Sequence, residues 1–435
     1  MLRQKDMKIS QFFINLKNWL LAPACYISKK GLEFSGFTLS WIMVAGIFVA
    51  AVGALQVTLL LATEPKKIAE GNRQASVIDL DKSTPASVPG AQDQSKKKST
   101  SKKRGNGSGS SPGPGQPPTP ASLSKQVAVY LPYWDQDNAF ASLQAHSDKV
   151  SVVHPVWYTP ESSGGIGQFS GAGNSAIINY SKSNSLKIIP SINNECDPIA
   201  IEQILADPNK INIHIQNIVS LVTSNSYDGI DIDYECFTNA GLKDVFSNFI
   251  NSLSNEMHSR GRYLTAAVHA KTSDAGGWSG AAAQDWSAIG SSVDQLLLMT
   301  YDYHWDTSGA GDIAPISWLQ AVLSYGKSRV SAAKILLGIH FYGYDWVGNN
   351  GADKTYNEVM AIIAAHSPSV QVSGEQEKYF VYNDGSDHTV FFADRDVVAP
   401  RVGLANTYGV AGIGIWRLGQ EDSENWQKIT EAFGG

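Results

Sequence analysis

Short, continuous apolar runs alternate with helix-length segments from Gln126 to the end of the chain. The runs are rich in aliphatic residues, as expected of strands that are buried on both faces. Eight of them are predicted to form strands: Gln126–Leu131, Val150–Trp157, Leu186–Ser191, Gly229–Glu235, Leu264–His269, Gln295–Tyr301, Ile335–Phe341 and Gly412–Trp416.

The segments between these runs have the periodicity of helices. In Leu242–Arg260, large apolar residues recur at spacings of three and four, and Gly261 follows as a stop signal. Eight strands that alternate with helices predict an α/β fold, a (β/α)₈ TIM barrel, over residues 125–435. A doubly wound open sheet is the main alternative for this alternation.

The segment between the last two expected strands is longer than a helical connection requires. Around residues 351–393 it holds one expected helix, Tyr356–Ala365, and strands that include Lys378–Tyr382 and Thr389–Phe392. We expect a small α+β insertion between strands 7 and 8 of the barrel, forming one wall of a cleft.

A long apolar run precedes the predicted barrel. Residues 37–63 contain no charged side chain, and the 22 residues Trp41–Ala62 could span the roughly 30 Å hydrocarbon core of a bilayer. We predict a single transmembrane helix, a signal anchor, after a cytoplasmic segment at 1–36. Basic residues before the run favour this orientation, with the barrel outside the cell membrane. A cleaved signal peptide and a buried core helix are the alternatives.

Residues 64–124 have no periodic apolar pattern and are rich in Lys, Ser, Pro and Gly. Such a segment cannot bury enough apolar surface to offset chain entropy, so a disordered linker is predicted. Charge is also uneven: residues 1–120 carry 16 Lys and Arg against 7 Asp and Glu, whereas residues 121–435 carry 18 against 33. An acidic folded part argues against a nucleic-acid partner.

Acidic and apolar residues alternate in the fourth expected strand, which reads YDGIDIDYE. Side chains alternate on a strand, so Asp231, Asp233 and Glu235 share a face. Three neighbouring carboxylates repel one another, and such a group is typical of a catalytic site that holds one acid protonated. A solvated edge strand is one alternative. A calcium loop is another, but Cys236 stands where an EF-hand needs Gly.

Further polar and aromatic residues lie at the ends of other expected strands, which meet at one face of a barrel. Aromatic rings there would suit a sugar site, because a pyranose ring offers a CH-rich face for stacking. For each single ring, packing in the barrel rim is the alternative. The strand-end residues are Tyr133, Trp134, Tyr301, Asp302, Tyr342 and Trp416.

With these residues the chain resembles the family 18 glycoside hydrolases, the chitinase-like enzymes. Three motifs carry the resemblance: the acidic run Asp228, Asp231, Asp233 and Glu235, the sixth-strand Met299, Tyr301 and Asp302, and the eighth-strand Trp416. The stretches FYGYDW and WRLGQED resemble a bacterial branch that includes spore-cortex and cell-wall hydrolases. His340 departs from that branch, which usually has proline there.

The resemblance implies substrate-assisted hydrolysis with retention, in which the 2-acetamido group of the sugar attacks its own anomeric carbon. Glu235 would act as the general acid and base, and Asp233 would orient the acetamido group. Asp231 would share a proton with Asp233. Tyr301 would bind the acetamide oxygen, and Trp416 would form an apolar floor.

The remaining motif residues have lesser implied roles. Asp302 would reach a sugar hydroxyl or the acetamide, and Asp228 would brace the strand. The other residues expected to contact substrate are Met299, Tyr342, Tyr133 and Trp134. No metal and no other cofactor is expected, because the nine histidines show no metal-ligand spacing.

Two cysteines follow neighbouring expected strands, Cys196 the third and Cys236 the fourth. They would form a disulfide, which an external location permits, or remain two buried thiols. The sequence thus predicts a membrane-anchored, extracytoplasmic hydrolase of β-1,4 bonds beside N-acetylglucosamine, in peptidoglycan or a chitin-like polymer. A non-catalytic sugar-binding lectin is the alternative from another class, and a metal-dependent hydrolase barrel is a third.

Overall fold

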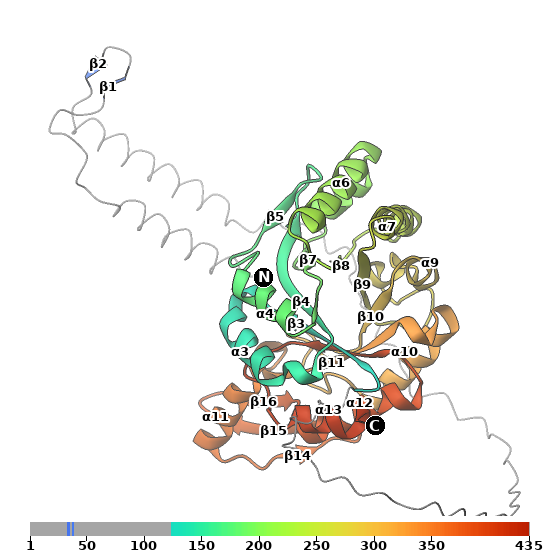
Figure 1. Cartoon of the computed structure of the whole chain (residues 1–435). Helices are drawn as coiled ribbons and strands as arrows, with labels where there is room; N and C mark the ends of the chain where they lie inside the picture. Colours follow the sequence, from blue (N-terminus) through green and yellow to red (C-terminus); the bar gives the residue numbers. More distant parts are fainter. Residues whose placement is uncertain (1–32, 35–36, 39–122, 435) are drawn as a thin grey trace, which may run out of the picture. The chain divides into compact units, whose positions relative to one another are not determined.

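The computed structural model of the chain describes residues 33–34, 37–38 and 123–434 (Figure 1). In its N-terminal part, β1 (Glu33–Phe34) pairs antiparallel with β2 (Phe37–Thr38), which covers the first two residues of the expected anchor. The rest of that anchor, and residues 64–122 of the linker, lie outside the described residues. No helix among the residues described is both long and apolar enough to cross a membrane.

Eight parallel strands close into a barrel. Each strand pairs with the next one, and the last pairs with the first, so the sheet has no open edge. This closure confirms the predicted TIM barrel and excludes the doubly wound open sheet. In chain order the strands are β3 (Gln126–Leu131), β4 (Val152–Pro160), β7 (Ser191–Asn193), β8 (Gly229–Asp233), β9 (Tyr263–His269), β10 (Gln295–Met299), β11 (Ile335–His340) and β17 (Gly412–Trp416).

The third expected strand is divided in two. β6 (Lys187–Ile188) pairs with β4, and β7 resumes the ladder at Ser191 after a break at Pro190. Proline has no N–H to donate to a neighbouring strand, although the Pro190 carbonyl still accepts a 2.9 Å bond from the Asp231 N–H. The restart carries the strand to Asn193, two residues beyond the predicted end. A short strand, β5 (Ile166–Gln168), pairs antiparallel with the end of β4.

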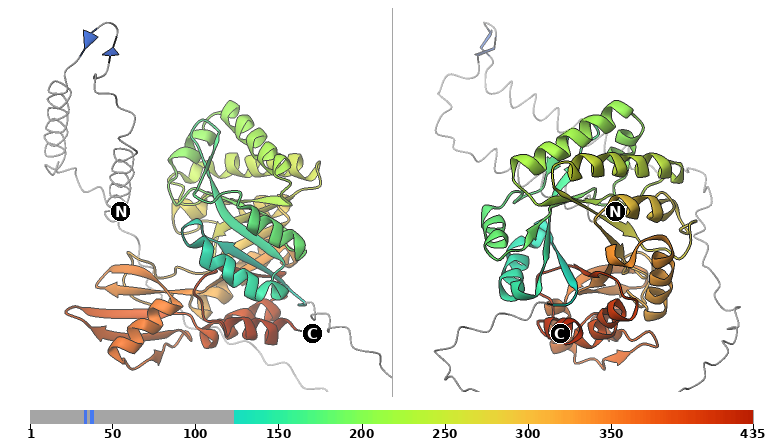
Figure 2. Two further views of the ribbon diagram at one scale, coloured as in Figure 1. Left: turned by 60° about the vertical axis from the view of Figure 1, so that its left-hand side comes forward. Right: turned by 45° about the vertical axis from the view of Figure 1, so that its right-hand side comes forward.

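Helices form a layer around the strands, as both views of Figure 2 show. The amphipathic helix expected at Leu242–Arg260 is α7 (Lys243–His258), which buries Phe246, Phe249 and Leu253 against the barrel. The other covering helices are α3 (Gln136–His146), α4 (Ser175–Ser183), α5 (Ile199–Leu205), α6 (Pro208–Ser224), α8 (Ser279–Ala282), α9 (Trp286–Ser292), α10 (Ile316–Arg329), α12 (Arg395–Thr407) and α13 (Asn425–Phe433).

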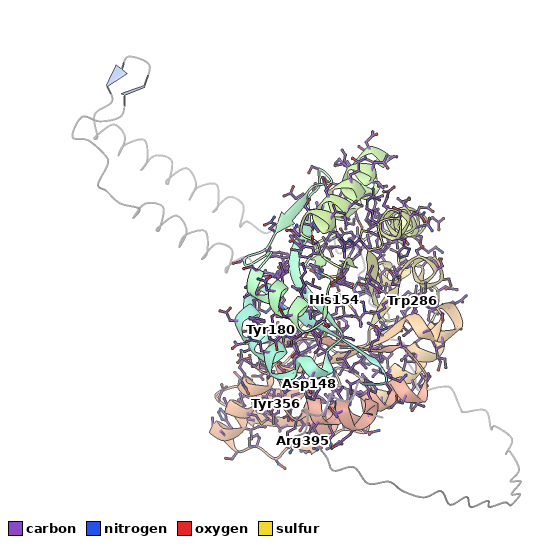
Figure 3. The ribbon with its side chains drawn as sticks, viewed as in Figure 1. Asp148, His154, Tyr180, Trp286, Tyr356 and Arg395 are labelled. Atoms are coloured by element: carbon purple, nitrogen blue, oxygen red, sulfur yellow. A yellow bond between two sulfur atoms is a disulfide. The ribbon has the colours of Figure 1, made fainter. Side chains whose placement is uncertain are left out.

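Strand alternation separates two cores. Ile230 and Ile232 of β8 face outward into the large core beneath the helices, which leaves Asp231 and Asp233 facing the barrel interior. The interior is otherwise filled by a smaller cluster that includes Tyr130 and Leu297. His154 of β4, labelled in Figure 3, stacks on Tyr130 with ring centroids 4.7 Å apart.

The insertion is a five-stranded antiparallel sheet with one helix, drawn in orange on one side of the barrel in Figure 2. It begins at Tyr342 rather than near residue 351, because its first strand continues almost directly from β11. Its elements are β12 (Tyr342–Val347), β13 (Asn350–Thr355), α11 (Tyr356–His366), β14 (Gln371–Val372), β15 (Lys378–Asn383) and β16 (Asp387–Phe392).

A buried charged cluster fastens this insertion to the barrel. His340 ends β11, and its Nε2 lies 2.8 Å from Glu377 Oε1 in the insertion. Arg401 of α12 places Nη2 3.4 Å from Glu377 Oε2 and also donates to the Ala314 carbonyl at 2.7 Å. All three side chains are fully buried. His340, the residue that departs from the motif, therefore has a buried acidic partner.

Candidate active site

Asp231 is the deepest acid of β8. One of its carboxylate oxygens accepts a 2.6 Å hydrogen bond from the Thr265 hydroxyl, and the other accepts one of 3.1 Å from the Tyr130 hydroxyl. The side chain is almost completely buried in the barrel interior.

Asp233 ends β8 with only one of its two oxygens paired. Oδ2 accepts a 2.6 Å hydrogen bond from Asn193 Nδ2, whereas Oδ1 is buried and has no partner among the described residues. Burial, followed by the charges of Glu235 and Asp231, raises the pKa of Asp233 well above its usual range. Both Asp231 oxygens bond hydroxyl groups, so proton sharing between Asp231 and Asp233 stays a prediction.

Glu235 lies two residues past the end of β8 and still points inward, because the alternation continues through Tyr234. Burial, and then the charge of Asp302, raise the pKa of Glu235 to about 7. Its main chain is held from both sides by Asn194, which accepts from the Glu235 N–H at 2.7 Å and donates to the Glu235 carbonyl at 3.0 Å. The main chain of Glu235 is thus fixed in place, and its carboxyl group can exchange a proton near neutral pH.

His269 is the basic side chain next to this acid, with Nε2 3.9 Å from Glu235 Oε2. The same nitrogen accepts a 3.1 Å hydrogen bond from the Cys236 N–H, so it carries no proton of its own. Burial lowers the pKa of His269 to about 4, which keeps the ring neutral. His269 therefore gives Glu235 no positive charge that would lower its pKa.

Asp302 follows β10 in a left-handed backbone conformation, with φ of +56°. Its Oδ1 accepts hydrogen bonds from the hydroxyl groups of Tyr342 and Tyr344, both on β12 of the insertion. Burial raises the pKa of Asp302. The insertion thus positions an acid that belongs to the barrel.

A cavity of about 130 Å³ opens between these groups. Its walls combine three carboxyl groups with aromatic and aliphatic surface, the mixture that suits a sugar ring. The lining residues are Tyr130, Asp233, Glu235, Ala267, Leu297, Met299, Tyr301, Asp302 and Trp416. Six residues expected at the site therefore meet at one cavity.

Besides the buried Asp231, four other expected residues do not line this cavity. Asp228 accepts a 2.8 Å hydrogen bond from the Ile188 N–H and thus connects β8 to β6. Tyr342 is buried against Asp302. Tyr133 stacks on Phe169 with centroids 4.3 Å apart, and Trp134 is 53% exposed with its ring 6.2 Å from that of Trp416. Trp134 thus lies next to Trp416, and Tyr133 packs against Trp134.

Several groups that hold the site are absent from the motifs. Tyr130 and Thr265 lie on inward-facing strand positions, which strand alternation alone could have indicated. Asn193 and Asn194 were hidden by the divided third strand, and Tyr344 comes from the insertion. No set of three His, Cys, Asp or Glu residues within the described ranges could hold a metal ion.

The structure joins Cys196 and Cys236 in a disulfide, with Cα atoms 5.0 Å apart. This bond connects the segment after β7 to the residue that follows Glu235. The disulfide lies at the same end of β7 and β8 as the hydrogen bond between Asn194 and the Glu235 main chain.

The model of the glycosyl hydrolases family 18 matches residues 126–421, which includes the whole cavity. The chain belongs to this family. It is therefore a glycoside hydrolase.

Relatives of this family 18 chain include spore and chitin enzymes. It is 30% identical to the cortical fragment-lytic enzyme of Bacillus cereus, over 53% of this chain but only 55% of that enzyme. Crystal structures of a Chromobacterium violaceum chitinase and of the Bacillus cereus spore cortex-lytic enzyme SleL share the fold, each with a TM-score of 0.66. The chitinase is 24% identical and SleL 22%. The matches cover 71% and 72% of this chain, and 98% and 75% of those chains.

Proposed function

We propose that this enzyme cleaves β-1,4 bonds beside N-acetylglucosamine by retaining, substrate-assisted catalysis. The observation that carries the proposal is the unpaired, buried Oδ1 of Asp233 in the same cavity as Glu235. An acceptor left without a donor in a buried site is unfavourable unless a ligand supplies one. The N–H of a 2-acetamido group is a suitable donor.

In the first step the acetamide oxygen attacks the anomeric carbon of its own sugar, and the glycosidic bond breaks. Glu235 gives its proton to the departing oxygen, and the resulting oxazolinium ion keeps its positive charge beside Asp233. In the second step Glu235 takes a proton from a water molecule, and the oxygen of that water adds to the anomeric carbon. The bond from the acetamide oxygen to this carbon breaks, which opens the oxazolinium ring and restores the acetamido group. A pKa of about 7 suits both the donation and the return of this proton.

The rest of the cavity supports these steps. Tyr301 would donate to the acetamide oxygen, and its pKa is raised well above the usual value by burial and by the surrounding acids, so its hydroxyl stays protonated. Trp416 would stack on the apolar face of the sugar ring. Asp302 would accept from a sugar hydroxyl with the oxygen that its two tyrosines leave free.

For the polymer, we propose peptidoglycan or a chitin-like chain, since the relatives are named for spore cortex and for chitin. We also propose that the enzyme works outside the cytoplasm, anchored through residues 37–63. The apolar run supports the anchor. A disulfide between Cys196 and Cys236, which we propose to persist in the working enzyme, fits an oxidising compartment.

The test is digestion of purified peptidoglycan and of β-1,4 N-acetylglucosamine oligomers by the full-length chain, with products resolved by mass. Wild type should cleave at least one of them, and Glu235→Gln should lose at least a hundredfold of that activity. A fully deacetylated polymer should resist cleavage. Binding without cleavage by wild type would instead support the sugar-binding lectin.

A further inference from the structure

An exposed tryptophan lies outside the cavity, next to a histidine that contacts Glu235. Trp278 belongs to the segment between β9 and α9 and is 47% exposed. Its indole packs edge-on against His269, with centroids 4.6 Å apart, and His269 in turn contacts Glu235. Neither His269 nor Trp278 lines the cavity, whereas Glu235 does. Glu235 therefore lies between the cavity and the pair formed by His269 and Trp278.

The ring of Trp278 is seated on a surface that fits it. A Cβ atom added to Gly280 would lie only 2.2 Å from an atom of the six-membered ring of the indole, so that ring lies directly against the Gly280 backbone. The Trp278 carbonyl accepts a 3.0 Å hydrogen bond from the Ala282 N–H. Only a glycine at position 280 permits this packing, and about half of the Trp278 side chain remains exposed to solvent, at 47%.

Buried polar contacts hold the whole segment. Lys271 Nζ donates to the carbonyl groups of Gln284 at 2.5 Å and of Ala281 at 3.1 Å. The Gln284 side chain accepts from the His269 N–H at 2.7 Å and donates to the Tyr234 carbonyl at 3.1 Å. The segment that carries Trp278 is thus tied to Tyr234, which directly precedes Glu235, and to His269 at the end of β9. A preformed aromatic surface of this kind binds ligands without a large ordering entropy.

The position of the acid decides which sugar this surface would meet. A general acid contacts the oxygen of the bond it cleaves, so the sugar that is attacked lies on the cavity side of Glu235. The sugar that leaves must then lie on the other side, where His269 and Trp278 are. We propose that Trp278 is a binding platform for an N-acetylhexosamine on the leaving-group side of the cleavage point. This proposal rests on the proposed function and adds a second binding surface to it.

The experiment compares two probes on full-length wild type, Trp278→Ala and Trp278→Phe. The first probe is a β-1,4 N-acetylglucosamine hexasaccharide, with peptidoglycan glycan strands assayed in parallel. The second is the oxazoline of di-N-acetylchitobiose, which enters the reaction after the leaving group has gone and needs no sugar on that side. Trp278→Ala should lose about tenfold in kcat/KM on the polymer that wild type cleaves. Its hydrolysis of the oxazoline should stay within about twofold of wild type, and Trp278→Phe should recover much of the loss.

Trp134→Ala is the contrast variant, because it removes an equally exposed tryptophan on the Trp416 side. With a hexasaccharide labelled at its reducing end, the two alanine variants should shift the cleavage position in opposite directions. Equal losses on both probes in Trp278→Ala, or no loss on either, would overturn the platform. A wild type that turns over neither probe nor glycan strands would overturn the proposed function itself.

Discussion

Asn193 Nδ2 donates a 2.6 Å hydrogen bond to Asp233 Oδ2. The same amide nitrogen lies 3.4 Å from Glu235 Oε1, so one side chain at the end of β7 contacts both acids that are expected to react. Its own oxygen accepts from the Glu195 N–H at 2.5 Å, which fixes the direction of the amide. Asn193 therefore fixes the distance between the two acids.

Asn193→Ala should reduce kcat roughly tenfold to a hundredfold, because both acids lose the group that orients them. The hydrogen bonds from Asn193 lower the pKa of Asp233 and of Glu235, so their removal should also move the alkaline limb of the pH profile upward. The measurement is kcat/KM against pH. Asn174→Ala removes an asparagine that caps α4 and should leave the profile unchanged. An unaltered profile in Asn193→Ala would contradict the assignment.

The pH dependence of the wild type should report Glu235. In the resting enzyme this acid must be protonated, so kcat/KM should fall as pH rises through about 7. The charge of Asp302 is the second cause of the raised pKa, after burial, so Asp302→Asn should move that limb to lower pH. The pH at which kcat/KM falls is the quantity to compare. The size of kcat/KM is not, because Asp302 also lines the cavity and its substitution should change substrate binding. A wild-type rate that stays flat up to pH 9 would exclude Glu235 as the acid.

The sequence patterns predicted the barrel and the cavity acids for physical reasons. Buried parallel strands read as apolar runs, and strand alternation places Asp231 and Asp233 on one face. The patterns missed Asn193 because Pro190 divides the third strand. The amino-acid sequence alone does not show at which residue the pairing with the neighbouring strands begins again after the proline. They predicted that Tyr342 contacts substrate, which stays a prediction, but not that its hydroxyl supports Asp302 from a sheet whose start was predicted nine residues too late. Contacts between distant segments, such as Tyr130 with Asp231, have no local signal in the chain.

Glu235→Gln should stabilise the fold at alkaline pH. The folded pKa of about 7 lies above the ordinary value of 4.5, so the folded state binds more protons and wild type loses stability as pH rises from 4.5 to 7. Glutamine has no such dependence, and the variant should gain about 1–3 kcal/mol in free energy of unfolding at pH 8 and little at pH 4. Urea unfolding at both pH values checks this. Glu256→Gln, at an exposed ion pair with Arg260, is the control and should change stability by less than about 1 kcal/mol.

Reduction of the disulfide should lower both stability and activity. Cys196 and Cys236 are 40 residues apart, and closing a loop of that length restricts the unfolded chain by about 4 kcal/mol in the entropy model. Because Cys236 directly follows Glu235, breaking the disulfide should also make the position of Glu235 less fixed and so lower kcat. Cys196→Ser and wild type under reductant should show the same fall in Tm and in kcat. Cys25→Ser is the matched control, and a Tm insensitive to reductant would mean that the two thiols are free.

The buried contact between His340 and Glu377 should be essential for the insertion. Burial alone would raise the pKa of Glu377, but His340 and Arg401 lower it below the ordinary value. The stability this acid contributes is therefore complete above pH 4.5 and is lost as pH falls through its folded pKa. Glu377→Gln should destabilise the enzyme by about 3–5 kcal/mol at pH 7, since it leaves Arg401 buried without its acid. Tyr342 and Tyr344 would then hold Asp302 less firmly, so KM should rise at temperatures where the fold persists.

Unfolding curves at pH 7 and pH 4 measure the loss of stability, and the difference in free energy of unfolding between Glu377→Gln and wild type should shrink at the lower pH. A variant equal in stability to wild type at pH 7 would show that the cluster does not fasten the insertion to the barrel.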